Sequence, residues 1–229
     1  KVIENIFFTL FQFALYLNAW IIYVYGVKNI TQCKLKYIPI LIGIGGDSGV
    51  GKTTFTNLLE NLFFDDEVLT IKGDDMHRWE RGDDNWKKLT HLSPKANMLY
   101  QNYKHLEELK AQKNIERRHY DHSTGKFTDK ILMKSKRIII FEGLHPFYLK
   151  KNRNLYDLKI FVRPEENLRL HWKITRDMEK RGYTREKVLE QLSQRKEDSI
   201  KYIDIQEKYA DLVISYYNIN NFKEVGGSN

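Results

Sequence analysis

The sequence predicts an α/β fold in which a parallel β-sheet is covered by helices on both faces. Short apolar runs of strand length alternate with longer stretches of helical periodicity along most of the 229 residues. A glycine-rich turn joins the first apolar run to the first helical stretch. A separate uncharged segment comes before this alternation, which predicts an apolar N-terminal helix ahead of the α/β domain.

The predicted strands are short runs rich in Ile, Val and Phe, each ended by glycine or by polar residues. They cover residues 37–44, 67–71, 136–141, 157–162 and 211–216. Pro39 has no backbone N–H, so pairing in the first strand is expected to begin at Ile40. Because the runs are mostly apolar rather than alternating, they suit a parallel sheet that is buried on both faces.

The predicted helices lie between these strands. They cover residues 51–62, 94–112, 164–181 and 185–209. The second is expected to open at Pro94, and the third to stop at Gly182. Residues 73–93 are charged and irregular, which is typical of a functional loop.

Residues 1–28 form a separate apolar segment, and the 23 residues from 5 to 27 carry no charge. As a helix at ~1.5 Å per residue, this stretch is about as long as the hydrocarbon layer of a bilayer is thick. Aromatic residues near its end and the lysines that follow favour a membrane anchor with the rest of the chain at the cytoplasmic face. The alternative is a soluble helix buried against the domain or against a second copy in a homodimer.

The chain is therefore expected to continue with a polar linker at 29–36, an α/β domain at 37–218 and a tail at 219–229. A formal net charge of +8 favours anionic partners such as nucleotides, sugar phosphates, nucleic acid or an anionic membrane. Cys33 is the single cysteine, so an internal disulfide is excluded.

The strongest motif is the turn GGDSGVGKTT at residues 45–54. Its glycines let main-chain N–H groups point at an anion, and the helix that follows adds the positive end of its dipole. Lys52 can reach the β- and γ-phosphates of ATP, and the Thr53 hydroxyl can bind Mg²⁺. A strand before and a helix after complete the context, which predicts a P-loop NTPase-type sheet. The expected ATP-binding residues are Gly46, Asp47, Ser48, Gly49, Val50, Gly51, Lys52, Thr53 and Thr54.

A second Mg²⁺ ligand is expected at the end of a neighbouring strand, because ligands bind at the carboxyl ends of such strands. Glu142 directly follows the run at 136–141 and is the candidate. Its carboxylate can bind Mg²⁺ directly or through water, together with Thr53.

The acceptor side of the site is expected in the loop after the second strand. Transfer of a phosphoryl group to a hydroxyl needs a carboxylate to take the hydroxyl proton, and Asp74 and Asp75 are the candidates. His77 and Arg81 can hold an anionic acceptor. These residues follow a strand beside the phosphate loop, and this favours a site over scattered surface charges.

A charged face is predicted on the helix that ends at Gly182. Lys173, Arg176, Asp177 and Arg181 lie at spacings that place them on one side of a helix. On the pattern alone, a solvated, salt-bridged surface is the favoured interpretation. Beside a γ-phosphate, the same cations would stabilise the transferred charge.

In this order, these segments resemble the phosphoribulokinase/uridine kinase family, and within it the phosphoribulokinases. The resemblance extends over about residues 40–216. Uridine kinases usually lack the histidine and arginine pair of the substrate loop, here His77 and Arg81, which favours the phosphoribulokinases. The segments that carry it are DDMH with Arg81, LTHLSPKAN at 89–97, YDHSTG at 120–125, FEGLHP at 141–146 and KITRDMEKRGYTRE at 173–186.

The resemblance implies a five-stranded parallel core with a helical lid. It also implies ATP-dependent phosphorylation of the 1-hydroxyl of ribulose 5-phosphate, with Asp74 as the base beside the catalytic residues Lys52 and Arg176. By the same resemblance, the sugar phosphate is surrounded by His77, Arg81, Tyr120, His122 and Lys173. Arg176 and Arg181 would handle the transferred charge or the substrate phosphate.

Other functions remain open on the sequence. The acceptor could instead be a nucleoside, another sugar phosphate or a polyol at the membrane. A nucleotide-binding regulatory domain would need no second anion site, so the set of residues around Asp74 and Arg176 speaks against it. Nucleic acid is not expected as a partner, because no recognised binding module is present.

Overall fold

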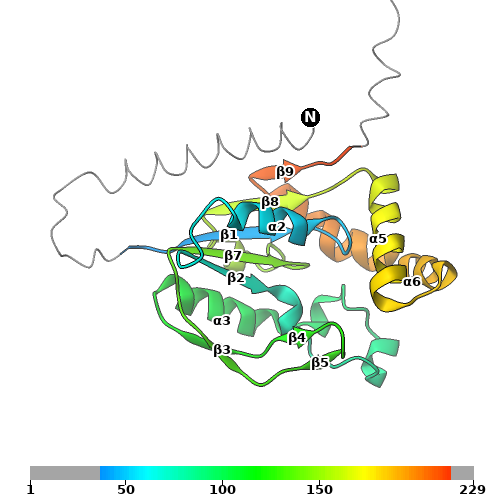
Figure 1. Cartoon of the computed structure of the whole chain (residues 1–229), viewed down its shortest axis with the longest axis horizontal. Coiled ribbons are helices and arrows are strands. Elements are labelled where there is room, and N and C mark those ends of the chain that lie inside the picture. The colour runs from blue at the N-terminus through cyan, green and yellow to red at the C-terminus, as the bar shows by residue number, and fades with distance from the viewer. Residues whose placement is uncertain (1–36, 218–229) are drawn as a thin grey trace, which may run out of the picture.

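The computed structural model describes residues 37–217 (Figure 1). The apolar segment at 1–28, the linker at 29–36 and the tail at 219–229 lie outside the described residues. Within residues 37–217, no helix combines the length and the apolar character that a bilayer span requires.

A five-stranded sheet forms the centre of the domain, in the order β2-β7-β1-β8-β9 (Figure 1). Every neighbouring pair is parallel, and pairing in the first strand begins at Ile40, as expected. The bounds are β1 Ile40–Gly45, β2 Val68–Lys72, β7 Ile138–Gly143, β8 Leu158–Val162 and β9 Leu212–Ile214. Each overlaps one of the five predicted runs, so the predicted parallel sheet is confirmed.

The described helices are α2 Lys52–Glu60, α3 Leu99–Lys110, α4 Lys150–Arg153, α5 Glu166–Arg181 and α6 Arg185–Asp198. Alternate side chains of β1 point to opposite faces of the sheet. Ile42 packs with Leu59 of α2 in one core cluster, whereas Leu41 packs with Leu106 of α3 in the other. Helices therefore cover both faces of the sheet, as the sequence predicts.

The helix predicted from Pro94 begins later than expected. Pro94–Ala96 forms a 3-10 turn, and α3 starts at Leu99. Between them the chain is extended, because Asn97 forms an isolated antiparallel bridge with His77 and the Met98 N–H donates to the Met76 carbonyl at 2.8 Å. A tertiary contact with the acceptor loop thus overrides the local helical preference of this segment.

The long helix predicted at 185–209 is interrupted. α6 ends at Asp198 and continues as a π-helical turn at Ser199–Ile203 and a 3-10 helix at Asp204–Tyr209. Residues 73–93 are mostly irregular, as predicted, with 3-10 turns at Gly73–Met76 and Asp84–Lys87.

Two small antiparallel ladders lie beside the sheet and were not predicted. β3 Ile115–Arg117 pairs with β6 Ile131–Met133, and β4 Tyr120–Asp121 pairs with β5 Lys126–Phe127. Strands of two or three residues are too short to produce a readable periodicity. The turn of the second ladder contains Gly125 at φ 75°, a conformation that favours glycine.

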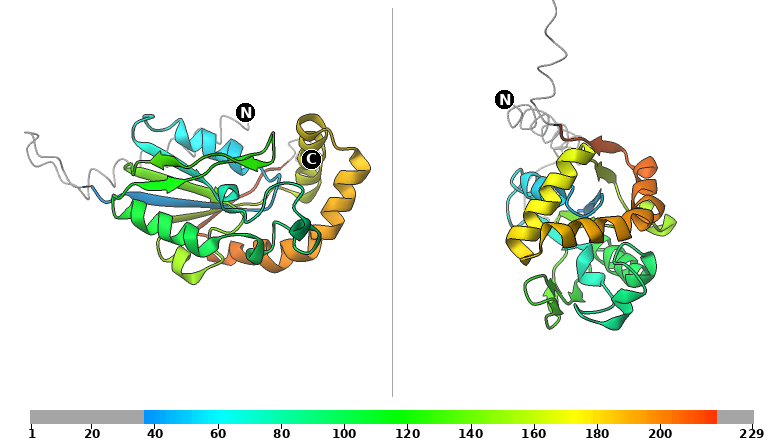
Figure 2. Two further views of the ribbon diagram at one scale, coloured as in Figure 1. Left: turned by 90° about the horizontal axis from the view of Figure 1, so that it is seen from below. Right: turned by 90° about the vertical axis from the view of Figure 1, so that its right-hand side faces the viewer.

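The carboxyl ends of β1, β2 and β7 meet at one edge of the sheet. Figure 2 shows α5 and α6 standing beyond this edge as a helical hairpin, in the place expected for a lid. The fold therefore gathers the phosphate loop, the acceptor loop and the charged face of α5 around a single region.

Candidate active site

The phosphate loop connects β1 to α2. Gly46, Gly49 and Gly51 have φ values of 144°, 85° and 89°, in the region that side chains disfavour. A Cβ at Gly46 would lie 2.6 Å from the Val162 carbonyl oxygen, and one at Gly49 would lie 3.0 Å from the Lys173 side chain. The glycines therefore allow both the anion-binding conformation and the close approach of β8 and α5.

The ammonium group of Lys52 lies across this loop. It donates hydrogen bonds to the carbonyl oxygens of Gly46 at 2.9 Å and Asp47 at 2.7 Å. Burial lowers the pKa of Lys52, and the nearby carboxylates of Glu142, Asp74 and Asp47 oppose that shift. Lys52 thus lies within electrostatic reach of both the metal-side carboxylate and the acceptor-side carboxylate.

Glu142 ends β7 beside the start of α2. Its carboxylate accepts hydrogen bonds from Thr53 Oγ1 at 3.3 Å and from Thr56 Oγ1 at 3.1 Å, and the residue is 6% exposed. Sequence reasoning had missed Thr56, which lies one helical turn after Thr53.

The donor set of Thr53 and Glu142 fits Mg²⁺, because both ligands are oxygen atoms and one is charged. Within residues 37–217, no cluster of three or more His, Cys, Asp or Glu side chains could hold a metal ion. Proteins usually bind Mg²⁺ through one or two side chains together with substrate phosphates and water, and Thr53 and Glu142 would hold the ion in this way.

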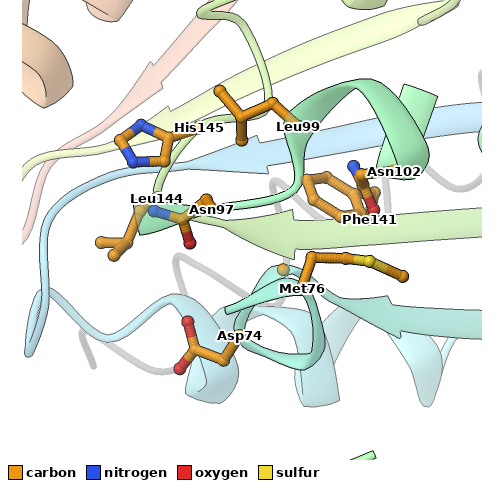
Figure 3. A pocket seen from close by; sticks show the side chains of 9 residues that line it. Asp74, Met76, Asn97, Leu99, Asn102, Phe141, Leu144 and His145 are labelled. Carbon is orange, nitrogen blue, oxygen red and sulfur yellow. The ribbon is translucent and has the colours of Figure 1, made fainter. Parts of the chain in front are cut away.

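A small pocket opens at the carboxyl ends of β2 and β7 (Figure 3). Its lining combines polar and apolar residues, and Asp74 is one of the polar ones. Its lining residues are Gly73, Asp74, Met76, Asn97, Leu99, Asn102, Phe141, Leu144 and His145.

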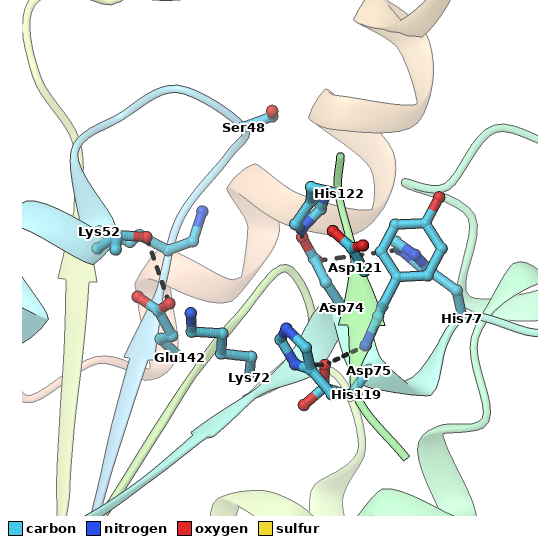
Figure 4. Close-up of polar contacts among 12 residues, drawn as sticks. Ser48, Lys52, Lys72, Asp74, Asp75, His77, His119, Asp121, His122 and Glu142 are labelled. Carbon is cyan, nitrogen blue, oxygen red and sulfur yellow. Dashed lines mark hydrogen bonds and ion pairs between the residues drawn. The ribbon is translucent and has the colours of Figure 1, made fainter. Parts of the chain in front are cut away.

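Asp74 lies in the turn after β2, with its side chain 38% exposed (Figure 4). Its carboxylate is 3.2 Å from His122 Nε2 and 3.9 Å from His77 Nε2. Burial opposes ionisation, but the hydrogen bond from His122 and the charges of both histidines and Lys52 outweigh it and hold the pKa of Asp74 well below its usual range. Asp74 is therefore an ionised, accessible carboxylate at neutral pH, as an acceptor base requires.

His77 is buried inside a ring of aromatic side chains. The ring centroids of Trp86, His91 and Tyr120 lie 5.6, 6.0 and 5.4 Å from its own. Burial lowers the pKa of His77 below its ordinary 6.5, and the charge of Asp74 opposes that shift. At neutral pH, His77 is thus a neutral hydrogen-bonding group beside Asp74.

Arg81 joins the acceptor loop to the β4–β5 turn. Its guanidinium donates to the carbonyl oxygens of His122 and Ser123. A Cβ at Gly125 would lie 2.4 Å from the Arg81 Cβ, so glycine is needed there for this contact. Burial raises the pKa of the Tyr120 hydroxyl, and the charge of the nearby Arg81 opposes that shift. Arg81, Tyr120 and His122, predicted from separate segments, are therefore brought together.

A buried arginine, Arg117, helps to hold this loop in place through Asp75. Arg117 donates to Asn102 Oδ1 at 2.9 Å and lies 3.6 Å from the Asp75 carboxylate. Asp75 also accepts from the Tyr120 N–H at 2.9 Å and lies 2.9 Å from His119 Nδ1. Asp75, the other candidate base, is thus engaged in holding the loop, which favours Asp74 as the base. No local signal in the sequence marked Arg117.

The predicted charged face of α5 is present, and its centre is buried. The Asp177 side chain is 0% exposed and lies 2.8 Å from Lys173, 2.9 Å from Arg176 and 3.4 Å from Arg181. Burial and the charge of Arg176 lower the pKa of Lys173 to about 8, against the opposing effect of Asp177. The salt bridges expected for a solvated surface are present, but Asp177 and Lys173 at the centre of this face are buried rather than solvated.

The same cations contact the phosphate loop. Lys173 Nζ and Arg176 Nη2 lie 3.3 Å and 3.4 Å from Ser48 Oγ. Asp47 accepts hydrogen bonds from Arg169 of α5 at 3.0 Å and from Ser199 Oγ at 2.8 Å. Sequence reasoning missed Arg169 and Ser199, because nothing in the spacing of either points to the phosphate loop.

Three further titratable residues near the site were not predicted. His91 and His145 belong to the segments LTHLSPKAN and FEGLHP, whose resemblance to the family was the only available signal. Burial lowers the pKa of both histidines, and His91 faces Arg195 of α6. Burial and the charge of Arg181 lower the pKa of Arg195, so Arg195 lies near the cations of α5.

This geometry can support phosphoryl transfer. A phosphate-binding loop, an oxygen donor pair suited to Mg²⁺, an ionised carboxylate and a cluster of cations lie around one edge of the sheet. Positioning and charge stabilisation by such groups are what this chemistry requires.

The sequence pattern of the Phosphoribulokinase / Uridine kinase family matches residues 41–222. A phosphoribulokinase of Synechocystis sp. is 37% identical over 175 residues, covering 76% of this chain and 53% of the relative. A uridine kinase of Borrelia turicatae is 35% identical over 180 residues, covering 76% and 85%. A solved phosphoribulokinase from Rhodobacter spheroides superposes with a TM-score of 0.63 at 27% identity, covering 78% of this chain and 70% of that one.

The chain spans about half the length of the phosphoribulokinases of Synechocystis sp. and Triticum aestivum, 53% and 48%. The family match covers most of the chain, however, and the described fold agrees with the Rhodobacter structure. The protein belongs to the phosphoribulokinase/uridine kinase family.

Proposed function

We propose that this protein is an ATP-dependent kinase that phosphorylates a hydroxyl group of a small sugar phosphate. The observation that carries the proposal is the relation between Lys52 and Asp74. Each alters the pKa of the other, so the phosphate-binding lysine and the acceptor carboxylate share one electrostatic environment. A hydroxyl beside Asp74 would then lie next to the γ-phosphate of an ATP held by the loop.

In this proposal the phosphate loop and Lys52 hold ATP, and Thr53 and Glu142 hold Mg²⁺. When bound, Mg²⁺ would neutralise charge on the β- and γ-phosphates. Arg176 and Lys173, which contact the loop through Ser48, would stabilise the charge of the transferred group.

The proposed reaction is an in-line transfer. Asp74 accepts the proton of the acceptor hydroxyl, and the hydroxyl oxygen forms a bond to the γ-phosphorus. The bond between that phosphorus and the β–γ bridging oxygen breaks, which releases ADP. Because the Asp74 side chain is 38% exposed, the proton can then pass to solvent.

Ribulose 5-phosphate, phosphorylated at its 1-hydroxyl, is the acceptor that we propose first. Three groups predicted around it, His77, Arg81 and Tyr120, lie together at the acceptor loop, and Arg81 adds a cation. The phosphoribulokinases among the relatives support the same choice. The predicted apolar segment at 5–27 would hold the site at the cytoplasmic face of a membrane if it inserts.

A nucleoside acceptor is the second candidate. A uridine kinase of Borrelia turicatae is 35% identical to this chain over 180 residues, which supports this candidate. Activity on acceptors with and without a phosphate group distinguishes the two candidates, because a sugar phosphate carries a phosphate and a nucleoside does not.

ADP release from MgATP tests the proposal. The purified protein is compared on ribulose 5-phosphate, other pentose and heptose phosphates, uridine, cytidine and buffer alone. We expect strong stimulation by ribulose 5-phosphate, and a drop of ~10²-fold or more in the Asp74→Asn variant with ATP binding intact. Near-normal turnover in that variant would reject Asp74 as the base. Stimulation by a nucleoside alone would favour the uridine kinase branch, and silence on every acceptor would favour a regulatory nucleotide-binding domain.

A further inference from the structure

His145 is a buried histidine at the active edge that the proposed reaction does not use. It follows β7 and lines the pocket (Figure 3). The residue is 5% exposed. Within the described part of the chain, neither of its ring nitrogens has a side-chain hydrogen-bond partner, although the backbone of His91 interacts with the ring. A buried polar group that lacks hydrogen-bond partners destabilises the fold, so such a group in a native protein often serves to bind a ligand or a water molecule.

The position of this ring is fixed by its neighbours. Gln206 is fully buried, donates to the Leu144 carbonyl at 2.8 Å and accepts from the Phe147 N–H at 2.9 Å. The main chain on both sides of His145 is therefore tied down, and the ring of Tyr148 lies 5.9 Å from the histidine ring. Groups held in this way suit binding, because little freedom is lost when a ligand arrives.

The electrostatic surroundings define the kind of ligand that fits. Burial and the charge of His77 lower the pKa of His145 to about 3, whereas Asp74 and the main chain at His91 favour its protonated form. The ring is therefore neutral at working pH, with one N–H donor and one acceptor nitrogen. A hydroxyl group can use either nitrogen. A phosphate would lie near the ionised Asp74 without a compensating charge on this ring.

We infer that His145 binds an uncharged hydroxyl of the sugar acceptor, next to the hydroxyl that Asp74 deprotonates. The inference rests on the proposed function and adds to it a subsite for the sugar rather than for its phosphate. The acceptor would thus be bound through two of its groups. Cations would bind its phosphate, and the neutral ring of His145 would bind a hydroxyl on its carbon chain. Substrates that lack or misplace that hydroxyl would be discriminated against at His145.

The chain offers a matched pair of variants. His145→Phe keeps an aromatic ring and removes both nitrogens. Tyr156→Phe removes another buried polar atom without a partner, the Tyr156 hydroxyl, which lies in the core cluster beside Phe147 and not in the pocket lining. If His145 binds the acceptor, only the first variant should impair acceptor use.

Kinetics with the full chain provide the first test. We expect kcat/KM for ribulose 5-phosphate to fall about 10- to 100-fold in His145→Phe, the scale for leaving a buried hydroxyl unpaired. KM for ATP should stay within about twofold, and Tyr156→Phe should match the parent protein. In the parent protein, kcat/KM for either the 3-deoxy or the 4-deoxy analogue should be lower than for ribulose 5-phosphate by a similar factor. In the His145→Phe variant, this difference between the analogue and ribulose 5-phosphate should disappear. If His145→Phe lowers kcat/KM by the same factor for the deoxy analogue as for ribulose 5-phosphate, the inference is overturned.

A second measurement does not depend on turnover. Ring signals of ¹⁵N-labelled histidine are recorded by NMR, and the His145 signal is assigned by its absence in His145→Phe. Ribulose 5-phosphate should move this signal, whereas inorganic phosphate should not. If ribulose 5-phosphate gives no turnover, the proposed function fails, and the other panel compounds are then added. A shift with any polyhydroxy compound supports the subsite, and no shift with all of them overturns it.

Discussion

The buried carboxylate of Asp177 is the residue whose replacement the structure allows us to follow most closely. It is surrounded by Lys173, Arg176 and Arg181, and its own side chain is 0% exposed. Asp177→Asn keeps the shape and one oxygen and removes the charge. The two arginines are 32% and 29% exposed and can turn to water, but the Lys173 side chain is 2% exposed and cannot. The penalty should therefore appear at Lys173.

The size of this penalty follows from the pKa of Lys173. That pKa is about 8 rather than the ordinary 10.5, so at about 1.36 kcal/mol per pKa unit the charged lysine already costs the fold about 3 kcal/mol. The hydrogen bond and charge of Asp177 oppose this lowering, so their loss should take the pKa of Lys173 below 8. At pH 7 the additional cost cannot exceed that of releasing one proton, about 1.4 kcal/mol.

The dependence on pH has a defined sign. In Asp177→Asn, consider the pH range between the new pKa of Lys173 and about 8. There Lys173 is protonated in the unfolded chain but not in the folded chain, so the stability of the variant rises with pH. The stability of the parent protein rises with pH only above about pH 8. Above that pH, the free energies of unfolding of the parent protein and the variant change in parallel. Asp177 is ionised throughout this range because its pKa is lowered, so its own contribution is constant.

Urea unfolding of both proteins from about pH 6 to about pH 9 measures this difference. The free-energy penalty of Asp177→Asn should shrink as pH rises toward 8. The same substitution in a Lys173→Met background should show a penalty that does not vary with pH. A penalty in the Lys173 background that is flat, or that grows with pH, would refute the reasoning.

Two further predictions concern the phosphate side of the site. Thr56→Val removes the 3.1 Å hydrogen bond to Glu142 in a side chain of the same shape, so the Mg²⁺ concentration for half-maximal activity should rise about tenfold while the acceptor KM is unchanged. An unaltered Mg²⁺ requirement in kinetic titrations would contradict that role. Ser199→Ala removes the 2.8 Å bond to Asp47, a bond to a charged group, and should raise the KM for ATP about tenfold. A rise confined to the acceptor KM would show that this bond serves another purpose.

Much of the fold could be predicted because its signals are local. The apolar runs at β1 and β7 are bounded by glycine or charged residues, and the glycines at 49 and 51 mark a turn that needs positive φ. The cluster of Lys173 and Asp177 was also predictable, because helical spacing alone places residues four apart on one face. In each case a short window of sequence contains the physical cause.

The remaining features depend on contacts between distant segments. The α3 start at Leu99 is set by bonds from the 94–98 segment to the acceptor loop, which no local propensity reveals. Arg117 and His145 are polar residues whose burial is a property of the assembled domain, so the sequence around them reads as ordinary loop or strand end. Family resemblance flagged the segment of His145 but gave the residue no role.

The order of the strands also fixes a length. The phosphate loop and Asp74 follow β1 and β2, and Glu142 lies near the carboxyl end of β7, which is between these two strands in the sheet. Adjacent strands lie about 4.8 Å apart, so the sheet sets the offset between the strand that leads into the phosphate loop and the strand that leads into the acceptor loop at about 10 Å, with the metal-side carboxylate midway. An extra strand inserted between them would lengthen this offset by about half and separate the reacting groups. Substitutions in the acceptor loop would leave this offset unchanged, whereas a rearrangement of the three strands would alter it.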